Sequence, residues 1–374
     1  MVISLEFEGS ALVDHHCHGV YDHDVSRAEF EASLNEGPGS SVLGTSVFDS
    51  MLGLALRRWC APILNLEPFC SPDDYLLRRT ELGFAEVNRR FLSLCGISDF
   101  IVDTGFAPNQ ITSPAATAAY AGQAAAHEII RLESTAADLI DGGTTTADFD
   151  DALRERLSGS GAVGAKSIAA YRAGLKISAQ KPDPATVREA LAACVADGKP
   201  ARINDRVLHS YLAWTAIELQ LPLQFHVGYG DNDVNLLDCD PLLLTPFLRA
   251  THSNVVPILL LHNYPFHRNA GYLAQVFGHV FVDLGLSTHN TGAFSRWLLP
   301  ELLELAPFGK VLFSSDAFGL SELYYLGAIL FRRALSNVTD RLIGSGDMQA
   351  ADADRLVALI SRHNAARVYG LATG

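Results

Sequence analysis

The stretch "ALVDHHCHGV" (residues 11–20) decides how the chain is interpreted, because an apolar run leads directly into one acid and three histidines. Its first six residues predict a buried β-strand. Side chains alternate across a strand, so we expect Asp14, His16 and His18 to share one face, with His15 on the other. Two imidazoles on one face can bind one metal ion, whereas hydrogen-bonded core histidines are the alternative interpretation.

Seven further short runs of aliphatic or β-branched residues each end in a polar or glycine-rich turn. They are residues 100–105, 127–133, 162–168, 221–227, 255–262, 279–285 and 310–316. Stretches with helical character, such as 183–198 and 292–307, lie between most of these runs. Strands that alternate with helices indicate parallel β-α-β units. Eight strands in a chain of 374 residues favour an α/β fold of the (β/α)8 TIM-barrel type over an open sheet.

The segment from about residue 21 to 98 is too long for one crossover between the first two strands. Within it, "SVFDSMLGLALRRWCAPILN" and "DDYLLRRTELGFAEVNRRFLSL" predict extra helices. We therefore expect a single barrel domain over residues 1–374, with a helical insertion after the first strand that covers the mouth of the active site.

Composition narrows the classes of partner. Apolar residues make up 48% and charged residues 19% of the chain, which is ordinary for a folded protein. The net charge is −14 and no run is rich in Lys or Arg, so we expect neither nucleic acid nor an anionic membrane as a partner. A small-molecule substrate remains, and a homo-oligomer is left open.

Cysteine usage and the N-terminus indicate a cellular compartment. The six cysteines are scattered, without a Cys-x-x-Cys pair, which favours reduced thiols in a cytoplasmic protein. The start "MVISLEFEGS" lacks the basic and apolar regions of a signal peptide, and no window of 18 uncharged apolar residues predicts a membrane span.

Polar residues gather where the predicted strands end. The first strand ends in His16 and His18, the fifth in His226, the sixth in His262 and the eighth in Asp316. The carboxyl ends of parallel strands form one face of a barrel, so these side chains are expected to meet there. Imidazole and carboxylate are suitable ligands for Zn, Mn or Fe, and a catalytic site keeps one position for water.

The motifs "LVDHHCHG", "FHVGYGD", "LLLHNYP" and "LFSSDAFG" together resemble the amidohydrolase superfamily, in the branch called amidohydrolase-related or amidohydrolase 2. "NAARVYGL" resembles the closing helix of that branch. "GAKSIAAYRAGL" and "ELYYLGA" resemble the amidohydrolase-like domains that are fused to glutamine synthetase. The resemblance covers nearly the whole chain and is loose over 21–98. It implies a (β/α)8 barrel with one or two divalent ions, Zn first and Mn or Fe as alternatives, bound by His16, His18, His226 and Asp316.

The resemblance also suggests catalytic roles. Asp316 would take a proton from a metal-activated water and pass it to the leaving nitrogen, and His262 is either a ligand of a second ion or an acid/base group. Lys166 ends the fourth strand, where several members of the superfamily carry a carboxylated lysine between two metals. It is interpreted as a carbamate ligand, as a cation for a substrate carboxylate, or as a solvated lysine.

Four further residues are candidates for substrate binding. They are Arg131, Tyr171, Arg172 and His289, each at or just after the end of a predicted strand. Guanidinium groups pair well with carboxylates, so a carboxylate-bearing substrate would suit this set. Kinship to domains fused with glutamine synthetase suggests a γ-glutamyl or other amino-acid amide.

Hydrolysis of an amide or related C–N bond is the leading functional hypothesis. Decarboxylation and lactone hydrolysis are rivals within the same branch, and the ligands alone do not separate the three reactions. A catalytically silent barrel with a binding or regulatory role is the alternative from another class, although such a barrel has no chemical need for the complete ligand set.

Overall fold

The computed structural model describes residues 11–37, 43–107, 109–196 and 200–372. Residues 1–10, on which the expectation of no signal peptide rests, lie outside the described part. No helix in the described ranges has both the length and the apolar character that crossing a bilayer requires.

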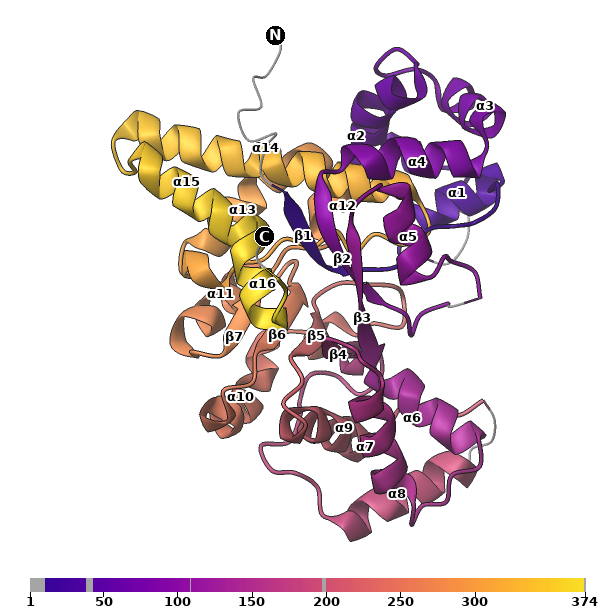
Figure 1. The fold of residues 1–374 in the computed structure, drawn as a ribbon, viewed down its shortest axis with the longest axis vertical. Coiled ribbons are helices and arrows are strands. Elements are labelled where there is room, and N and C mark those ends of the chain that lie inside the picture. The colour runs from indigo at the N-terminus through magenta and orange to yellow at the C-terminus, as the bar shows by residue number, and fades with distance from the viewer. Residues whose placement is uncertain (1–10, 38–42, 108, 197–199, 373–374) are drawn as a thin grey trace.

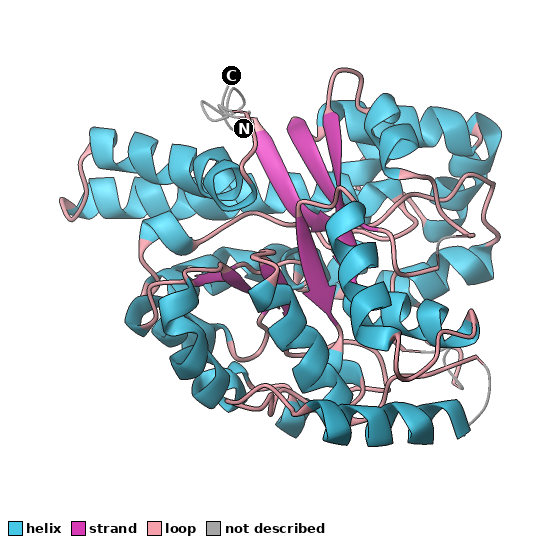
Figure 2. Cartoon of the chain, turned by 60° about the horizontal axis from the view of Figure 1, so that its bottom comes forward, coloured by secondary structure: helices cyan, strands magenta, loops and turns pink. Residues whose placement is uncertain are grey.

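Seven parallel strands form one sheet in the order of the sequence. They are β1 (Leu12–Cys17), β2 (Ile97–Asp103), β3 (Ala125–Arg131), β4 (Gly164–Ser167), β5 (Leu223–Val227), β6 (Ile258–His262) and β7 (Val280–Val282). Each overlaps one of the predicted runs. Helices surround the strands on the outside, which is the arrangement of a TIM-like α/β barrel (Figure 2).

The eighth predicted strand, residues 310–316, is an extended segment that bonds to both edges of the sheet. The backbone N–H of Leu312 donates to the carbonyl of Val282 on β7 (2.9 Å), and that of Asp316 donates to His16 on β1 (2.9 Å). Its pairing with β7 is confined to an isolated bridge between Val282 and Val311. The segment leaves the extended conformation at Asp316, whose φ is 52°. The barrel is therefore closed by an irregular eighth segment.

Four α-helices lie between β1 and β2, in the region of the predicted insertion (Figure 1). They are α1 (Arg27–Ser33), α2 (Met51–Ala55), α3 (Pro72–Leu82) and α4 (Phe84–Leu94). Helix α1 begins with a capping box, in which Ser26 Oγ accepts from the Glu29 N–H and the Glu29 carboxylate accepts from the Ser26 N–H. Helix α3 begins with Ser71 as N-cap and proline at its first position.

The remaining helices follow the later strands. They are α5 (Pro114–Tyr120), α6 (Leu132–Asp141), α7 (Phe149–Gly159), α8 (Pro184–Ala196), α9 (Arg206–Glu218), α10 (Thr245–Thr251), α11 (His267–Val276), α12 (Ser287–Asn290), α13 (Ser295–Leu303), α14 (Ser321–Ser345), α15 (Ala350–Ala358) and α16 (Asn364–Tyr369). Single π-helical turns at Leu56–Cys60 and Leu359–His363 extend α2 and α15.

The interior of the barrel is filled by apolar side chains from β1, β2, β3, β6, β7 and the eighth segment. This cluster contains Val13, Ile101, Ile129, Leu259, Leu261, Phe281 and Leu312, together with Ala365, Val368 and Tyr369 of α16. Helix α16 therefore closes one end of the barrel. The polar ends of the strands are left to form the other end.

A β-bulge changes the pattern of β1. The pairing with β2 advances from Asp14–Phe100 to Cys17–Val102, which is three residues on β1 for two on β2. Asp14 accordingly does not line the cavity at the carboxyl ends of the strands, and its carboxylate accepts a hydrogen bond from the Ser315 N–H (2.9 Å). The prediction that Asp14 shares a face with His16 and His18 is therefore wrong, because the extra residue interrupts the alternation.

Candidate metal centre and pocket

A cavity of about 730 Å³ opens at the carboxyl ends of the strands. Every site residue predicted from the sequence lines it: His16, His18, Arg131, Lys166, Tyr171, Arg172, His226, His262, His289 and Asp316. Part of its wall comes from α1 and the loop after it. The segment between β1 and β2 thus contributes directly to the pocket.

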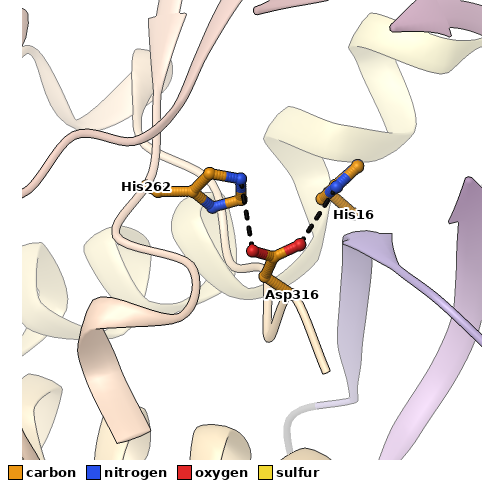
Figure 3. Close-up of side chains that lie close together, drawn as sticks. All are labelled: His16, His262 and Asp316. Atoms are coloured by element: carbon orange, nitrogen blue, oxygen red, sulfur yellow. Dashed lines mark ion pairs between the residues drawn. The ribbon is translucent and has the colours of Figure 1, made fainter. Parts of the chain in front are cut away.

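The carboxylate of Asp316 lies among three imidazoles. Its Oδ1 is 3.1 Å from Nε2 of His16 and 3.5 Å from Nε2 of His18, and its Oδ2 is 3.3 Å from Nε2 of His262. Figure 3 shows His16 and His262 approaching this carboxylate from opposite sides. Ligand atoms of His16, His262 and Asp316 all lie within 4.8 Å of one another, a spacing that one divalent ion can bridge.

A second group of potential ligands shares His16. It consists of His16, His18 and Asp103, again with ligand atoms within 4.8 Å of one another. Asp103 ends β2, and its Oδ2 pairs with Nη2 of Arg131 at 2.6 Å. Asp103 was not in the predicted ligand set, although its position in the run "FIVDTG" carried the same strand-end signal as the histidines.

His226 lies beside these groups but belongs to neither. Its Nε2 is 3.0 Å from the carbonyl oxygen of Tyr229, and its Nδ1 is 3.4 Å from the hydroxyl of Tyr171. The ring centroids of His226 and His262 are 4.7 Å apart. The ligand role expected for His226 therefore stays a prediction.

Gln224 orients the ring of His16. The Gln224 Oε1 accepts from Nδ1 of His16 (2.8 Å), which places the lone pair of this ring on Nε2, the nitrogen nearest to Asp316. The amide of Gln224 is itself fixed, because its Nε2 donates to the carbonyl of His15 (2.9 Å) and to the hydroxyl of Tyr369 (2.8 Å). The barrel core is thus connected to the site through hydrogen bonds.

His262 is held in an unusual backbone conformation. Its φ is 70°, and its N–H donates to the buried carboxylate of Asp283. Neither ring nitrogen has a hydrogen-bond partner among the described residues, although the side chain is fully buried. Buried polar atoms are almost always satisfied, so this ring is suited to a ligand that the protein atoms alone do not provide.

Burial favours the neutral form of the His16, His226 and His262 imidazoles, because desolvation lowers the pKa of each. Desolvation lowers the pKa of His16 to about 4 and that of His226 to about 3, and the charge of Lys166 adds to both shifts. Burial alone would raise the pKa of Asp316, but the surrounding imidazoles hold it well below its usual range. Neutral imidazoles beside an ionised carboxylate are the forms that bind a metal ion.

Lys166 is buried at the end of β4. Its Nζ lies 3.4 Å from Nε2 of His16. Desolvation lowers its pKa to about 8, although the carboxylates of Asp316 and Asp103 act in the opposite direction. A solvated lysine, one of the three interpretations, does not fit a side chain that is only 2% exposed.

The two predicted substrate-binding arginines already have carboxylate partners. Arg131 donates through Nε (3.0 Å) and Nη2 (2.6 Å) to Asp103, and Arg172 donates to Asp233 (2.9 Å). His289 is buried in the cavity wall, with Nδ1 3.0 Å from the side-chain oxygen of Asn290. The arginines thus contribute less free positive charge than the sequence suggested.

Some residues around the cavity were not predicted. Glu36 and Asn290 line it, and Asp283 binds His15 (2.7 Å) and Ser314 (2.6 Å) beneath it. Asp283 follows an apolar run in "HVFVDLG", as Asp103 does in its strand, so this pattern could have identified it. Glu36 lies in a loop without periodicity, where the sequence gives no signal.

Comparisons with known proteins agree with this architecture. Residues 94–371 match the protein family described as Amidohydrolase. Protein fluG of Emericella nidulans is 29% identical in an alignment of 281 positions, which covers 66% of this chain and 32% of fluG. The chain therefore spans about a third of the length of that relative.

Solved structures show a similar fold over nearly the whole chain. A Lactobacillus casei protein, provisionally described as a metal-dependent hydrolase, is 27% identical with a TM-score of 0.82 and covers 97% of this chain and 96% of its own. A uronate isomerase from Thermotoga maritima is 15% identical with a TM-score of 0.65, over 97% and 95% of the two chains. The second likeness concerns the fold alone.

Proposed function

Because this chain belongs to the amidohydrolase family, we propose that it is a metal-dependent hydrolase that cleaves an amide or related C–N bond. The substrate is a small carboxylate-bearing molecule, and a γ-glutamyl or other amino-acid amide is the first candidate. The observation that carries the proposal is the Asp316 carboxylate among His16, His18 and His262 in the cavity. The 374 residues act as one hydrolase domain in this proposal.

The residues present fit a divalent ion. His262 offers two buried ring nitrogens without hydrogen-bond partners, and Gln224 leaves Nε2 of His16 available. The proposed ligands are His16, His18, His226 and Asp316, and His262 is either a ligand of a second ion or an acid/base group. Zinc is the first candidate, with manganese or iron as alternatives. When bound, such an ion polarises a carbonyl and makes water nucleophilic near neutral pH.

Proton transfer is assigned to the chain's own residues. Asp316 is ionised and central, so its carboxylate can accept a proton from water and donate it to the leaving nitrogen. His262 is neutral and lies 3.3 Å from that carboxylate, which makes it the second acid/base candidate if it does not hold an ion.

Binding of the substrate carboxylate is assigned to the basic wall of the cavity. Arg172 is partly exposed there and shares Asp233 with Arg202, so this single carboxylate faces two guanidinium groups. Tyr171 lies beside the same wall with its hydroxyl near His226. A guanidinium that shares its acid retains donors for a second carboxylate.

The experiment compares metal-loaded and chelated protein on γ-glutamyl amides, N-acyl amino acids, lactones and aromatic carboxylates. We expect turnover of an amide class that requires metal and is lost in His16→Ala. His363→Ala is the matched control, because His363 is exposed and does not line the cavity. Release of CO₂ without hydrolysis would assign a decarboxylase instead, and full activity after chelation would contradict the proposal.

A further inference from the structure

One acidic side chain in the cavity wall has no basic partner. Glu36 follows α1 and lines the cavity that contains Asp316. The groups that act on its carboxyl are Asp316, Asp231 and the side chain of Asn290, and none of these is a cation. No ion pair joins Glu36 to a basic side chain within the described ranges.

The basic groups of the cavity are engaged elsewhere. Arg131 is paired with Asp103, Arg172 with Asp233 and His23 with Asp22, and Lys166 lies against His16. The wall around Glu36 is therefore negative or neutral.

A neutral histidine with an unused nitrogen lies in the same wall. Nε2 of His289 has no hydrogen-bond partner among the described residues, and the side chain is 3% exposed. Its neighbour Asn290 donates to the hydroxyl of Tyr229 (2.8 Å) and lies against Glu36. Burial lowers the pKa of His289 to about 4, so its ring adds no positive charge. This wall thus presents a carboxylate and a buried nitrogen without a partner, and both can accept hydrogen bonds from an ammonium group.

We infer that Glu36 is a specificity-determining residue that binds an ammonium group of the substrate. The inference rests on the proposed function and refines its substrate class. The substrate would be an amide that carries a free primary amine in addition to the amide group at the proposed metal ligands. The amine would lie beside Glu36, in the same cavity as Asp316.

The electrostatic state of Glu36 is consistent with this role. Burial raises its pKa to about 7 and the charge of Asp316 adds to the shift, whereas the hydrogen bond from Asn290 lowers it. A carboxylate that is costly to ionise alone gains most from a cation that arrives beside it.

The test measures binding by calorimetry, with the zinc-loaded protein at a pH about one unit above the pKa of Glu36. The probes are ω-aminocarboxylates of increasing chain length, each paired with the alkyl carboxylate in which a methyl group replaces the ammonium group. At the best length we expect the amine to bind about tenfold more tightly than its isostere, which corresponds to about 1.4 kcal/mol. Glu36→Gln should remove this preference and leave the affinity for the alkyl carboxylate unchanged.

Glu155→Gln is the control, because Glu155 is exposed on α7 and its replacement changes the net charge equally. Equal affinity within every pair, no binding of any probe, or a preference that persists in Glu36→Gln would overturn the inference. Hydrolysis is not part of this measurement, so an amine preference in a protein that cleaves no amide would contradict only the proposed function.

Discussion

Nε2 of His262 lies 3.3 Å from Oδ2 of Asp316, and both residues have left-handed backbones, with φ angles of 70° and 52°. Each such conformation costs a non-glycine residue about 1–2 kcal/mol. The two residues end β6 and the eighth segment of the barrel, where a regular strand would have continued the alternation. The backbone is therefore strained at both positions where the imidazole of His262 and the carboxylate of Asp316 come into contact.

The ring of His262 also depends on an adjacent glycine. A Cβ added to Gly285 would lie 2.1 Å from Nδ1 of His262. We predict that Gly285→Ala displaces this ring and lowers metal-dependent activity about 100-fold, as expected when a catalytic group moves by about 1 Å. Bound metal per chain and activity are the measurements.

The control separates backbone strain from this contact. Gly122 has a φ of 86°, and a Cβ there would meet nothing within 4 Å. Gly122→Ala should cost about 1 kcal/mol of stability and leave metal binding unchanged. Equal loss of metal in both variants would show that the contact with His262 is unimportant.

Metal binding should stabilise the folded chain. If the proposed ligands hold zinc, free zinc at about 100 times its dissociation constant stabilises the protein by about 2.7 kcal/mol. We expect chelation to lower the melting temperature and Asp316→Asn to abolish the response to added zinc. Asp354→Asn, on an exposed position of α15, should retain the full response. An unchanged melting temperature in the wild type would argue against a resident ion.

The strand ends could be identified from sequence because each carries its own signal. The apolar run before His16 and the one before His262 predicted where these histidines meet, and parallel strands bring their carboxyl ends to one face. The site residues predicted from strand ends accordingly line one cavity. This success depends on local patterns and on one general property of barrels.

The details that the sequence did not provide depend on contacts between distant segments. The bulge after Asp14 arises from register with β2, and the orientation of His16 depends on Gln224. The pairing of Arg131 with Asp103 joins two neighbouring strands. Sequence periodicity contains no information on such partners. An arginine that is interpreted as a free cation from the sequence can therefore have a carboxylate partner in the structure, as Arg131 does.

Acid should weaken the hydrogen bond that joins the Glu133 carboxylate to Ser167 at the end of β4. Burial raises the pKa of Glu133, but hydrogen bonds from His209 and Ser167 and the charge of His209 outweigh it, so the pKa is lowered. A lowered pKa in the folded state stabilises the protein above the unfolded value of 4.5, and this stability is lost as the pH falls through the folded pKa. We predict that Glu133→Gln costs about 1–3 kcal/mol near neutral pH and flattens the loss of stability in acid.

Chemical denaturation at a series of pH values measures this effect. Glu189→Gln is the control, since Glu189 is exposed on α8. Parallel pH profiles for the wild type and Glu133→Gln would refute the assignment.

Lys166 is predicted to react with CO₂. Its burial lowers its pKa to about 8, which increases the fraction of neutral amine, and the neutral amine is the form that adds to CO₂ to give a carbamate and a proton. The resulting carboxylate would lie next to Nε2 of His16, which is 3.4 Å from Nζ. With ¹³C-bicarbonate and zinc we expect a carbamate signal in the NMR spectrum that Lys166→Met lacks, together with loss of activity in that variant.

Lys310 is the matched control, because burial lowers its pKa as well while its Nζ donates to the carbonyls of Ala274 and Phe277 (2.6 Å each). Lys310→Met should keep the signal. A wild-type protein that is active without any carbamate signal would leave Lys166 as a cation for the substrate carboxylate, and Lys166→Met would then raise KM without changing the metal content.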